Sequence, residues 1–105
     1  MRGDVWSIAG SGYASKPRPA VIVQNNESDV FDSSIVCLLT SQNYPDARTR
    51  VRILPNEENG LDRECFVMAD KVLAVKKSSF GGLIGRLSAA DMEQVGLALK
   101  FALGL

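Results

Sequence analysis

The sequence predicts a small, mainly β protein in which short strands form a barrel and one C-terminal α-helix caps it. Its 105 residues, 46% of them hydrophobic, suit a single domain, residues 1–105, with one core. Short apolar or alternating runs separated by turn residues predict strands through most of the chain. Helical spacing is convincing only near the C-terminus. Many short strands followed by one helix favour a capped β-barrel.

Three strands are predicted in the first half of the chain. Residues 4–8 alternate between apolar and polar side chains, which indicates a half-buried strand. Residues 19–24 form a continuous apolar run, which indicates a strand buried on both faces. The run from Ser34 to Thr40 has the same character, and the polar cluster Ser41, Gln42 and Asn43 follows it directly. Polar side chains therefore gather at the end of this third strand.

Further strands are predicted in the second half. Residues 48–54 alternate so regularly that Arg48, Arg50 and Arg52 fall on one face. The opposite face carries Thr49, Val51 and Ile53. Two short strands, residues 65–68 and 71–75, are expected on either side of Ala69 and Asp70, and another covers residues 83–86 after two glycines.

The predicted helix begins after Ser88, a favourable N-cap, and Asp91 in its first turn supports the helix dipole. Its apolar stripe consists of Met92, Val95, Leu99 and Ala102, widened by Phe101 and Leu103. A stripe of this breadth indicates core packing.

Composition excludes several chemistries. The chain has no histidine, so a histidine general base and histidine metal ligands are excluded. Cys37 and Cys65 lie in apolar runs and are interpreted as buried free thiols of a cytoplasmic protein. No metal site, cofactor or membrane segment is expected. The 12 basic and 12 acidic residues cancel, so any polyanion site must arise from local clustering.

Arg18 stands between Pro17 and Pro19, immediately before an apolar strand. The prolines stiffen the backbone, and a guanidinium held in a rigid setting suits a phosphate. A plain strand entry with a surface arginine explains the same spacing equally well.

Taken in order, the motifs resemble the MazF/PemK toxins, the mRNA interferases of type II toxin–antitoxin modules. The resemblance rests on Gly3-Asp4-Val5-Trp6, Arg18-Pro19, Thr40-Ser41, Asp70 and the terminal helix, and it covers nearly the whole chain. It implies an SH3-like barrel of the CcdB/MazF type, a homodimer and a cognate MazE-like antitoxin. It also implies sequence-specific, metal-independent cleavage of single-stranded mRNA.

Residue by residue, the resemblance makes Arg18 and Thr40 catalytic, with Ser41 beside them. RNA supplies its own nucleophile, the 2′-hydroxyl, so the protein must mainly orient the phosphate and stabilise its charge. The products are then a 2′,3′-cyclic phosphate and a 5′-hydroxyl. The expected RNA-binding residues are Tyr13, Lys16, Gln42 and Asp70.

Two questions stay open from the sequence. The alternative function is that of a non-catalytic CcdB-like poison of DNA gyrase on the same fold. Its members rely on a tryptophan near the C-terminus, whereas the only tryptophan here is Trp6. The arginine face of residues 48–52 either widens an RNA footprint or is a solvated edge-strand face that deters aggregation.

Overall fold

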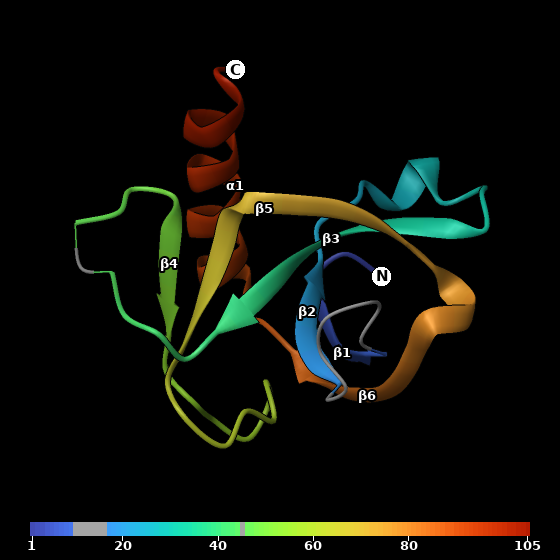
Figure 1. The fold of residues 1–105 in the computed structure, drawn as a ribbon, viewed down its shortest axis with the longest axis horizontal. Coiled ribbons are helices and arrows are strands. Elements are labelled where there is room, and N and C mark those ends of the chain that lie inside the picture. Colours follow the sequence, from blue (N-terminus) through green and yellow to red (C-terminus); the bar gives the residue numbers. More distant parts are fainter. Residues whose placement is uncertain (10–16, 45) are drawn as a thin grey trace.

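In the part of the chain that the structure describes, six antiparallel strands form one sheet, and a single α-helix packs against one end of it (Figure 1). A computed structural model describes residues 1–9, 17–44 and 46–105. The strands are β1 (Asp4–Ile8), β2 (Arg18–Ile22), β3 (Ser33–Thr40), β4 (Arg50–Ile53), β5 (Cys65–Lys76) and β6 (Phe80–Arg86). The helical elements are the short 3-10 helices η1 (Asn26–Ser28) and η2 (Lys77–Ser79), and α1 (Ala89–Leu103). The prediction of a mainly β chain with one terminal helix is confirmed.

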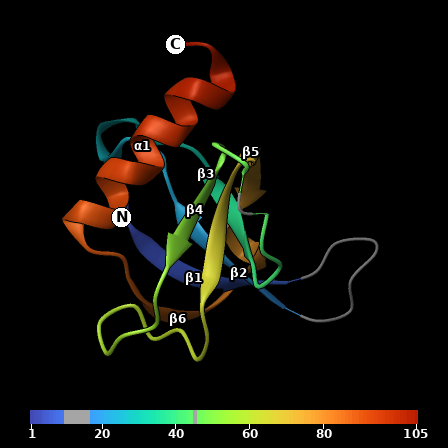
Figure 2. The same cartoon turned by 90° about the vertical axis from the view of Figure 1, so that its left-hand side faces the viewer.

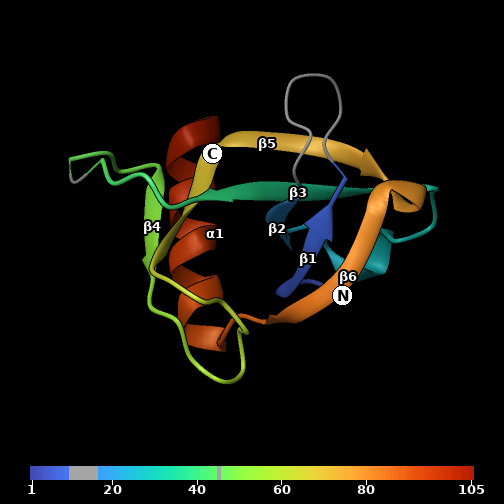
Figure 3. The ribbon, with the colours of Figure 1, turned by 60° about the horizontal axis from the view of Figure 1, so that its bottom comes forward.

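The strand order is β4-β5-β3-β2-β1-β6, with every neighbouring pair antiparallel. The sheet is strongly curved. Figure 3 shows β5 leading through η2 into β6, so that this arm bends around β1 and β2. Figure 2 shows α1 running across the sheet near β4 and β5, the strands against which it packs. The start of β2 and the end of β3 lie at one open rim of the sheet, where both line surface grooves.

Apolar side chains form two clusters, one on each face of the sheet. The larger cluster lies between the sheet and α1 and includes Val21, Leu39, Ile53 and Val95. The second cluster is built on Ile8, Ala20, Ile22, Val36 and Val75, with Trp6 and Phe80 packed against it. Because β2 contributes to both clusters, the prediction that it is buried on both faces is confirmed. In β3 the same prediction is wrong for Ile35, which is 42% exposed beyond the last residue pair with β2.

The expectation of two strands around Ala69 and Asp70 is wrong, because β5 is one continuous strand of 12 residues. The register against β3 shifts between the pairs Cys37–Val72 and Leu39–Val67. The extra residues of β5 form an irregularity that turns Asp70 outward while strand pairing continues. Strand β6 is likewise longer than predicted, since it begins at Phe80 and includes both glycines.

Both ends of α1 have the expected capping. Ser88 Oγ accepts a hydrogen bond from the Asp91 backbone N–H at 3.1 Å, and Gly104 ends the helix with a positive φ of 71°. Val95 and Ala98 are buried, whereas Leu97, Phe101 and Leu103 are about half exposed. The apolar surface of α1 therefore extends beyond the core of this chain. None of the helices in the described residues has the length and apolarity needed to cross a membrane.

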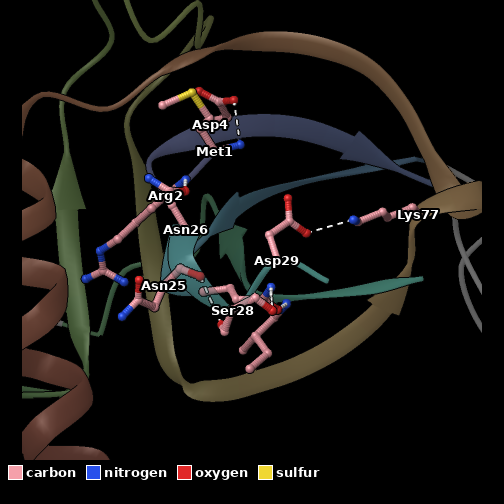
Figure 4. A network of polar contacts seen from close by, with 10 residues as sticks. Met1, Arg2, Asp4, Asn25, Asn26, Ser28, Asp29 and Lys77 are labelled. Atoms are coloured by element: carbon pink, nitrogen blue, oxygen red, sulfur yellow. Dashed lines mark hydrogen bonds and ion pairs between the residues drawn. The ribbon is translucent and has the colours of Figure 1, made fainter. Parts of the chain in front are cut away.

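Polar contacts tie the N-terminus to the turn around η1 (Figure 4). The Met1 ammonium lies 3.0 Å from an Asp4 carboxylate oxygen, and the backbone N–H of Arg2 donates to the Asn26 side chain at 2.7 Å. Asp29 pairs with Lys77 of η2 at 2.7 Å. These contacts hold the β2–β3 connection at the end of the sheet away from Thr40.

The loop after β4 is anchored by Asn59, a buried polar residue. Its side-chain oxygen accepts the backbone N–H groups of Asn56 and Leu61, and its amide donates to the Leu54 carbonyl. Asn59 is 1% exposed, so these bonds satisfy polar atoms that water cannot reach. Gly60 follows with a φ of 65°, and a Cβ there would lie 2.1 Å from the Ile84 carbonyl oxygen. The loop thus packs closely on β6.

Candidate active site

Arg18 and Thr40 lie on neighbouring strands at the open rim of the sheet. Arg18 is the first residue of β2, and Thr40 is the last residue of β3. In the antiparallel register Ala20 pairs with Leu38, and continuing it by two residues sets Arg18 opposite Thr40. Directly opposed side chains share one face of a sheet and are close enough to contact one ligand. The two residues expected to be catalytic are therefore brought together.

Two concave surfaces meet at this pair. The larger one, here called the Arg63 groove, has a volume of about 760 Å³. It is lined by the segment Pro17 to Pro19, by Thr40 and Ser41, and by residues 60–63 of the loop that Asn59 anchors. The smaller one, here called the Lys71 groove, has a volume of about 270 Å³. Because Arg18 and Thr40 line both grooves, an extended chain could pass from one to the other across them.

The Lys71 groove is lined by basic side chains. Its polar and aromatic lining consists of Arg18, Thr40, Gln42, Tyr44, Arg50 and Lys71. Leu38 and Met68 complete it. Within the described chain, three basic residues and no acidic residue line this groove. A concave surface with this lining favours an anionic ligand, although the whole chain carries no net charge.

The hydroxyl group of Thr40 is held in place by a backbone hydrogen bond. Its oxygen accepts a hydrogen bond from the backbone N–H of Gln42 at 3.1 Å. A threonine hydroxyl also carries one proton that it can donate. Since the oxygen is already held as an acceptor, the proton is available for an acceptor on a ligand in either groove. A non-bridging phosphate oxygen is such an acceptor.

Arg50 and Asp70 form a bidentate ion pair next to the Lys71 groove. Arg50 Nε and Nη2 donate to the two carboxylate oxygens of Asp70 at 2.9 and 3.1 Å. The side chain of Arg50 is only 12% exposed, and its Cζ lies 5.0 Å from the centre of the Tyr44 ring. Hydrogen bonds from Arg50 hold the pKa of Asp70 below its ordinary value of 3.8. Asp70 is therefore a carboxylate at neutral pH.

The other two arginines of the alternating segment have different neighbours. Arg52 pairs with Glu64 at 2.8 Å, and its side chain is 63% exposed. The Arg48 guanidinium lies over the Phe101 ring of α1, with 3.9 Å from Cζ to the ring centre. All three arginines line a surface groove between β4 and α1. Only Arg50 of the three also lines the Lys71 groove.

The structure brings Arg18, Thr40, Ser41 and Gln42 to one rim. Asp70 is adjacent through its contact with Arg50. The predictions for Tyr13 and Lys16 lie outside the described residues.

Sequence reasoning missed two groove residues, Tyr44 and Lys71, and it named Arg50 only as one of the three arginines on the face of residues 48–52. Arg50 could have been singled out only by knowing that its strand is paired with the strand of Asp70. Tyr44 directly follows the polar cluster Ser41, Gln42 and Asn43, and an aromatic residue next to that cluster was an available signal.

The two cysteines are free and buried, as expected. Burial is the main cause that raises the pKa of the Cys37 thiol, to about 11, and it also raises that of Cys65. Neither thiol is therefore activated as a nucleophile. The described residues contain no group of three or more His, Cys, Asp or Glu side chains arranged to hold a metal ion.

Comparisons with known proteins agree with this fold. Residues 1–103 match the family described as PemK-like, MazF-like toxin of type II toxin–antitoxin system. A relative from Mycolicibacterium smegmatis, named probable endoribonuclease MazF, is 36% identical over 99% of this chain and 96% of its own length. Another relative, endoribonuclease MazF9 of Mycobacterium tuberculosis, is 26% identical over the same shares. This chain therefore belongs to the MazF/PemK family of endoribonuclease toxins.

The fold is similar to that of solved structures in this family. A mycobacterial endoribonuclease, solved in complex with its cognate antitoxin, superposes with a TM-score of 0.85 and is 27% identical. The superposition covers 100% of this chain and 95% of that one. The predicted fold class is thus confirmed as the MazF fold, a six-stranded antiparallel sheet with a C-terminal helix.

Proposed function

We propose that this toxin is a sequence-specific endoribonuclease that cleaves single-stranded mRNA without a metal ion. The observation that carries the proposal is the juxtaposition of Arg18 and Thr40 where the two grooves meet. A guanidinium and a hydroxyl donor on one rim can stabilise the negative charge that develops on a phosphodiester during cleavage, and neither requires a histidine. Residues 1–105 act as one toxin domain, and RNA lies across the rim from the Arg63 groove into the Lys71 groove.

The reaction is an in-line displacement at phosphorus. The 2′-oxygen of the nucleotide before the cut forms a bond to phosphorus, and the bond from phosphorus to the 5′-oxygen breaks. The 2′-hydroxyl loses its proton, and the departing 5′-oxygen gains one. The ends are a 2′,3′-cyclic phosphate and a 5′-hydroxyl, and DNA is spared because it has no 2′-hydroxyl.

Arg18 and Thr40 stabilise the charge that develops on the phosphate. Two N–H groups of Arg18 bind non-bridging oxygens, and its planar fork fits them in a way that a lysine ammonium does not. The Thr40 hydroxyl donates to a non-bridging oxygen, because its own oxygen is held by the Gln42 N–H. Ser41 assists from the Arg63 groove.

The RNA on either side of the cut is held by groups around the rim. Gln42 reads a base edge in the Lys71 groove through its side-chain amide. Lys16 binds a phosphate and Tyr13 stacks on a base, which accounts for the preference for single strands. Asp70 contributes to RNA binding at the same groove.

The proposed partners follow from the same surfaces. A MazE-like antitoxin with an acidic tail occupies the RNA groove, in keeping with the antitoxin complex of the mycobacterial relative. The chain forms a homodimer, because Leu97, Phe101 and Leu103 leave an apolar face of α1 uncovered. With mRNA as the substrate and two free thiols, the protein works in the cytoplasm.

The test is cleavage of a long RNA by the purified protein in EDTA, followed by mapping of the ends. We expect discrete cuts with 5′-hydroxyl ends, none in DNA of the same sequence, and none at a site whose cleaved nucleotide is 2′-deoxy. Arg18→Ala and Arg18→Lys should both lose most activity while their melting temperatures stay near wild type. Cleavage that EDTA abolishes and a divalent ion restores would refute the mechanism. Inhibition of DNA gyrase without RNA cleavage would instead favour the gyrase poison.

The partner proposals have separate tests. Light scattering at micromolar concentration should give the mass of a dimer, and a monomer mass would contradict the role assigned to the face of α1. In a competition titration, antitoxin tail should displace a non-cleavable RNA, and added salt should weaken both complexes. RNA affinity that saturating antitoxin leaves unchanged would show that inhibition acts elsewhere.

A further inference from the structure

The position of Arg50 directs its guanidinium to the face of the sheet that carries Arg18 and Thr40. Arg50 begins β4, an edge strand, and pairs with Met68 of β5. Both residues line the Lys71 groove together with Arg18 and Thr40. Strand β4 is three strand spacings from β2, which is about 14 Å at the usual spacing. Arg50 and Arg18 therefore approach the groove from opposite sides.

Asp70 holds this guanidinium in one orientation. It receives one N–H from Nε and one from Nη2, at 2.9 and 3.1 Å. A guanidinium has five N–H groups, so three remain: two on Nη1 and one on Nη2. Among the described residues the guanidinium of Arg50 donates no other hydrogen bond. A largely buried cation with three unused donors beside a groove is prepared to bind an anion.

The groove itself supports this interpretation. Its described lining contains Arg18, Arg50 and Lys71 but no carboxylate, and Asp70, which is hydrogen-bonded to Arg50, is not among the lining residues. The Tyr44 ring lies against the Arg50 guanidinium, which restricts its movement on the other side. Asp70 and Tyr44 thus hold the Arg50 side chain in place at the groove wall, whereas an arginine on an ordinary solvated surface is free to move.

We propose that Arg50 is a second phosphate-binding guanidinium of this site, and that Asp70 is the positioning residue that orients it. The inference rests on the proposed cleavage of RNA and adds to it. Arg18 and Thr40 bind the phosphate that is cut, and Arg50 binds a neighbouring phosphate of the same RNA strand within the Lys71 groove. Its binding aligns the strand so that the 2′-oxygen, phosphorus and 5′-oxygen lie in line.

Arg52 provides a matched control. It lies two residues further along β4, on the same face, and pairs with Glu64 at 2.8 Å. Its side chain is 63% exposed, compared with 12% for Arg50, and it does not line the Lys71 groove. Arg50→Gln and Arg52→Gln therefore remove the same charge and the same kind of ion pair from the same strand. They differ in whether the groove loses a donor.

The experiment measures single-turnover cleavage in EDTA and binding of an RNA made uncleavable by one 2′-deoxy nucleotide. Arg50→Gln should slow cleavage about 10- to 100-fold, the usual range for a charge-assisted contact. It should also make the plot of log affinity against log salt shallower by about 0.7, the change for one phosphate of a single strand. Arg52→Gln should stay within about twofold of wild type and keep the wild-type slope.

Two further variants separate binding from folding. Asp70→Asn keeps the Arg50 charge but loosens its orientation, so cleavage should slow while the salt slope stays near wild type. If Arg50→Gln fails to fold by circular dichroism, the double variant Arg50→Gln/Asp70→Asn leaves no unpaired charge and should show the same losses. An Arg50 variant that equals Arg52→Gln in both rate and slope would overturn the inference. A wild-type chain that leaves RNA intact would refute the proposed function instead, so the two failures are distinguishable.

Discussion

Replacement of Thr40 by valine isolates one hydroxyl group of the proposed site, because the two side chains have nearly the same shape. In the structure that hydroxyl accepts one hydrogen bond, from the Gln42 N–H at 3.1 Å. The loss of one neutral hydrogen bond costs about 0.5–1.5 kcal/mol of folding free energy. Gln42 is exposed, so water replaces the lost acceptor and the cost should fall at the low end. The melting temperature should drop by no more than about 4–8 °C.

The catalytic loss should be much larger. A preorganised donor to a developing negative charge typically contributes about 10²–10³ in rate, or about 2.7–4 kcal/mol. A domain of this size is stable by about 5–15 kcal/mol, so a cost near 1 kcal/mol leaves nearly every molecule folded. A fall of 10²-fold or more in the Thr40→Val variant therefore cannot come from unfolding.

The assay is single-turnover cleavage of an end-labelled RNA in EDTA, with the melting temperature measured on the same preparations. Thr40→Ser keeps a hydroxyl on the same Cβ and should recover most of the rate, which a purely steric role of the methyl group would not allow. If Thr40→Val cleaves within a few-fold of wild type, the hydroxyl does not donate to the phosphate and Thr40 leaves the proposed mechanism.

Three other outcomes follow from buried or paired groups. Since Arg50 lowers the pKa of Asp70 below 3.8, the pair stabilises the fold above about pH 4, and this stability is lost as the pH falls through the lowered pKa. Urea unfolding between about pH 2 and 6 should show this loss in wild type and a flatter profile in Asp70→Asn. With its pKa raised to about 11, the Cys37 thiol should resist a thiol reagent at about pH 8 until denaturant is added, whereas fast labelling of the native protein would contradict its burial. Asn59→Ala removes three side-chain hydrogen bonds and should destabilise the fold by about 2–4 kcal/mol in the same unfolding assay, a value near zero being inconsistent with the anchor.

The strands and the helix could be predicted from the sequence because each is a local pattern. Alternation identified β1 and β4, continuous apolar runs identified β2 and β3, and Ser88 marked the start of α1. The continuity of β5 could not be predicted, because polar residues inside a strand suggest a turn unless the irregular pairing with β3 is known. The hydrogen bonds of the Asn59 side chain connect residues up to five positions apart and leave no periodic signature.

The candidate site could be predicted from the sequence only in part, because some of its contacts join residues that are far apart in the chain. Arg18 begins β2 and Thr40 ends the adjacent strand β3. The resemblance to the toxin family placed both residues in one site before the register of these strands was known. Arg50 and Asp70 are 20 residues apart and meet only because β4 and β5 are neighbours in the sheet. The alternation of residues 48–54 showed that Arg50, Arg48 and Arg52 share a face, but it did not distinguish them. Different neighbours now do so: Asp70, Phe101 and Glu64.

A chain with no net charge can still have a positively charged groove, because its acidic side chains can form ion pairs elsewhere and leave the basic residues of the groove unneutralised. Several acidic residues form ion pairs elsewhere: Glu64 pairs with Arg52, Asp29 pairs with Lys77, and Asp4 pairs with both Arg86 and the N-terminal ammonium. The described lining of the Lys71 groove contains no acid, and Asp70, which is bonded to Arg50, lies outside that lining. The field is therefore local, so the whole molecule does not steer RNA from a distance. With two or three phosphates bound, log affinity should fall with log salt at a slope of only about −1.4 to −2.1. Such weak dependence leaves recognition to the few groups at the rim, as the proposed sequence-specific cleavage of single-stranded RNA requires.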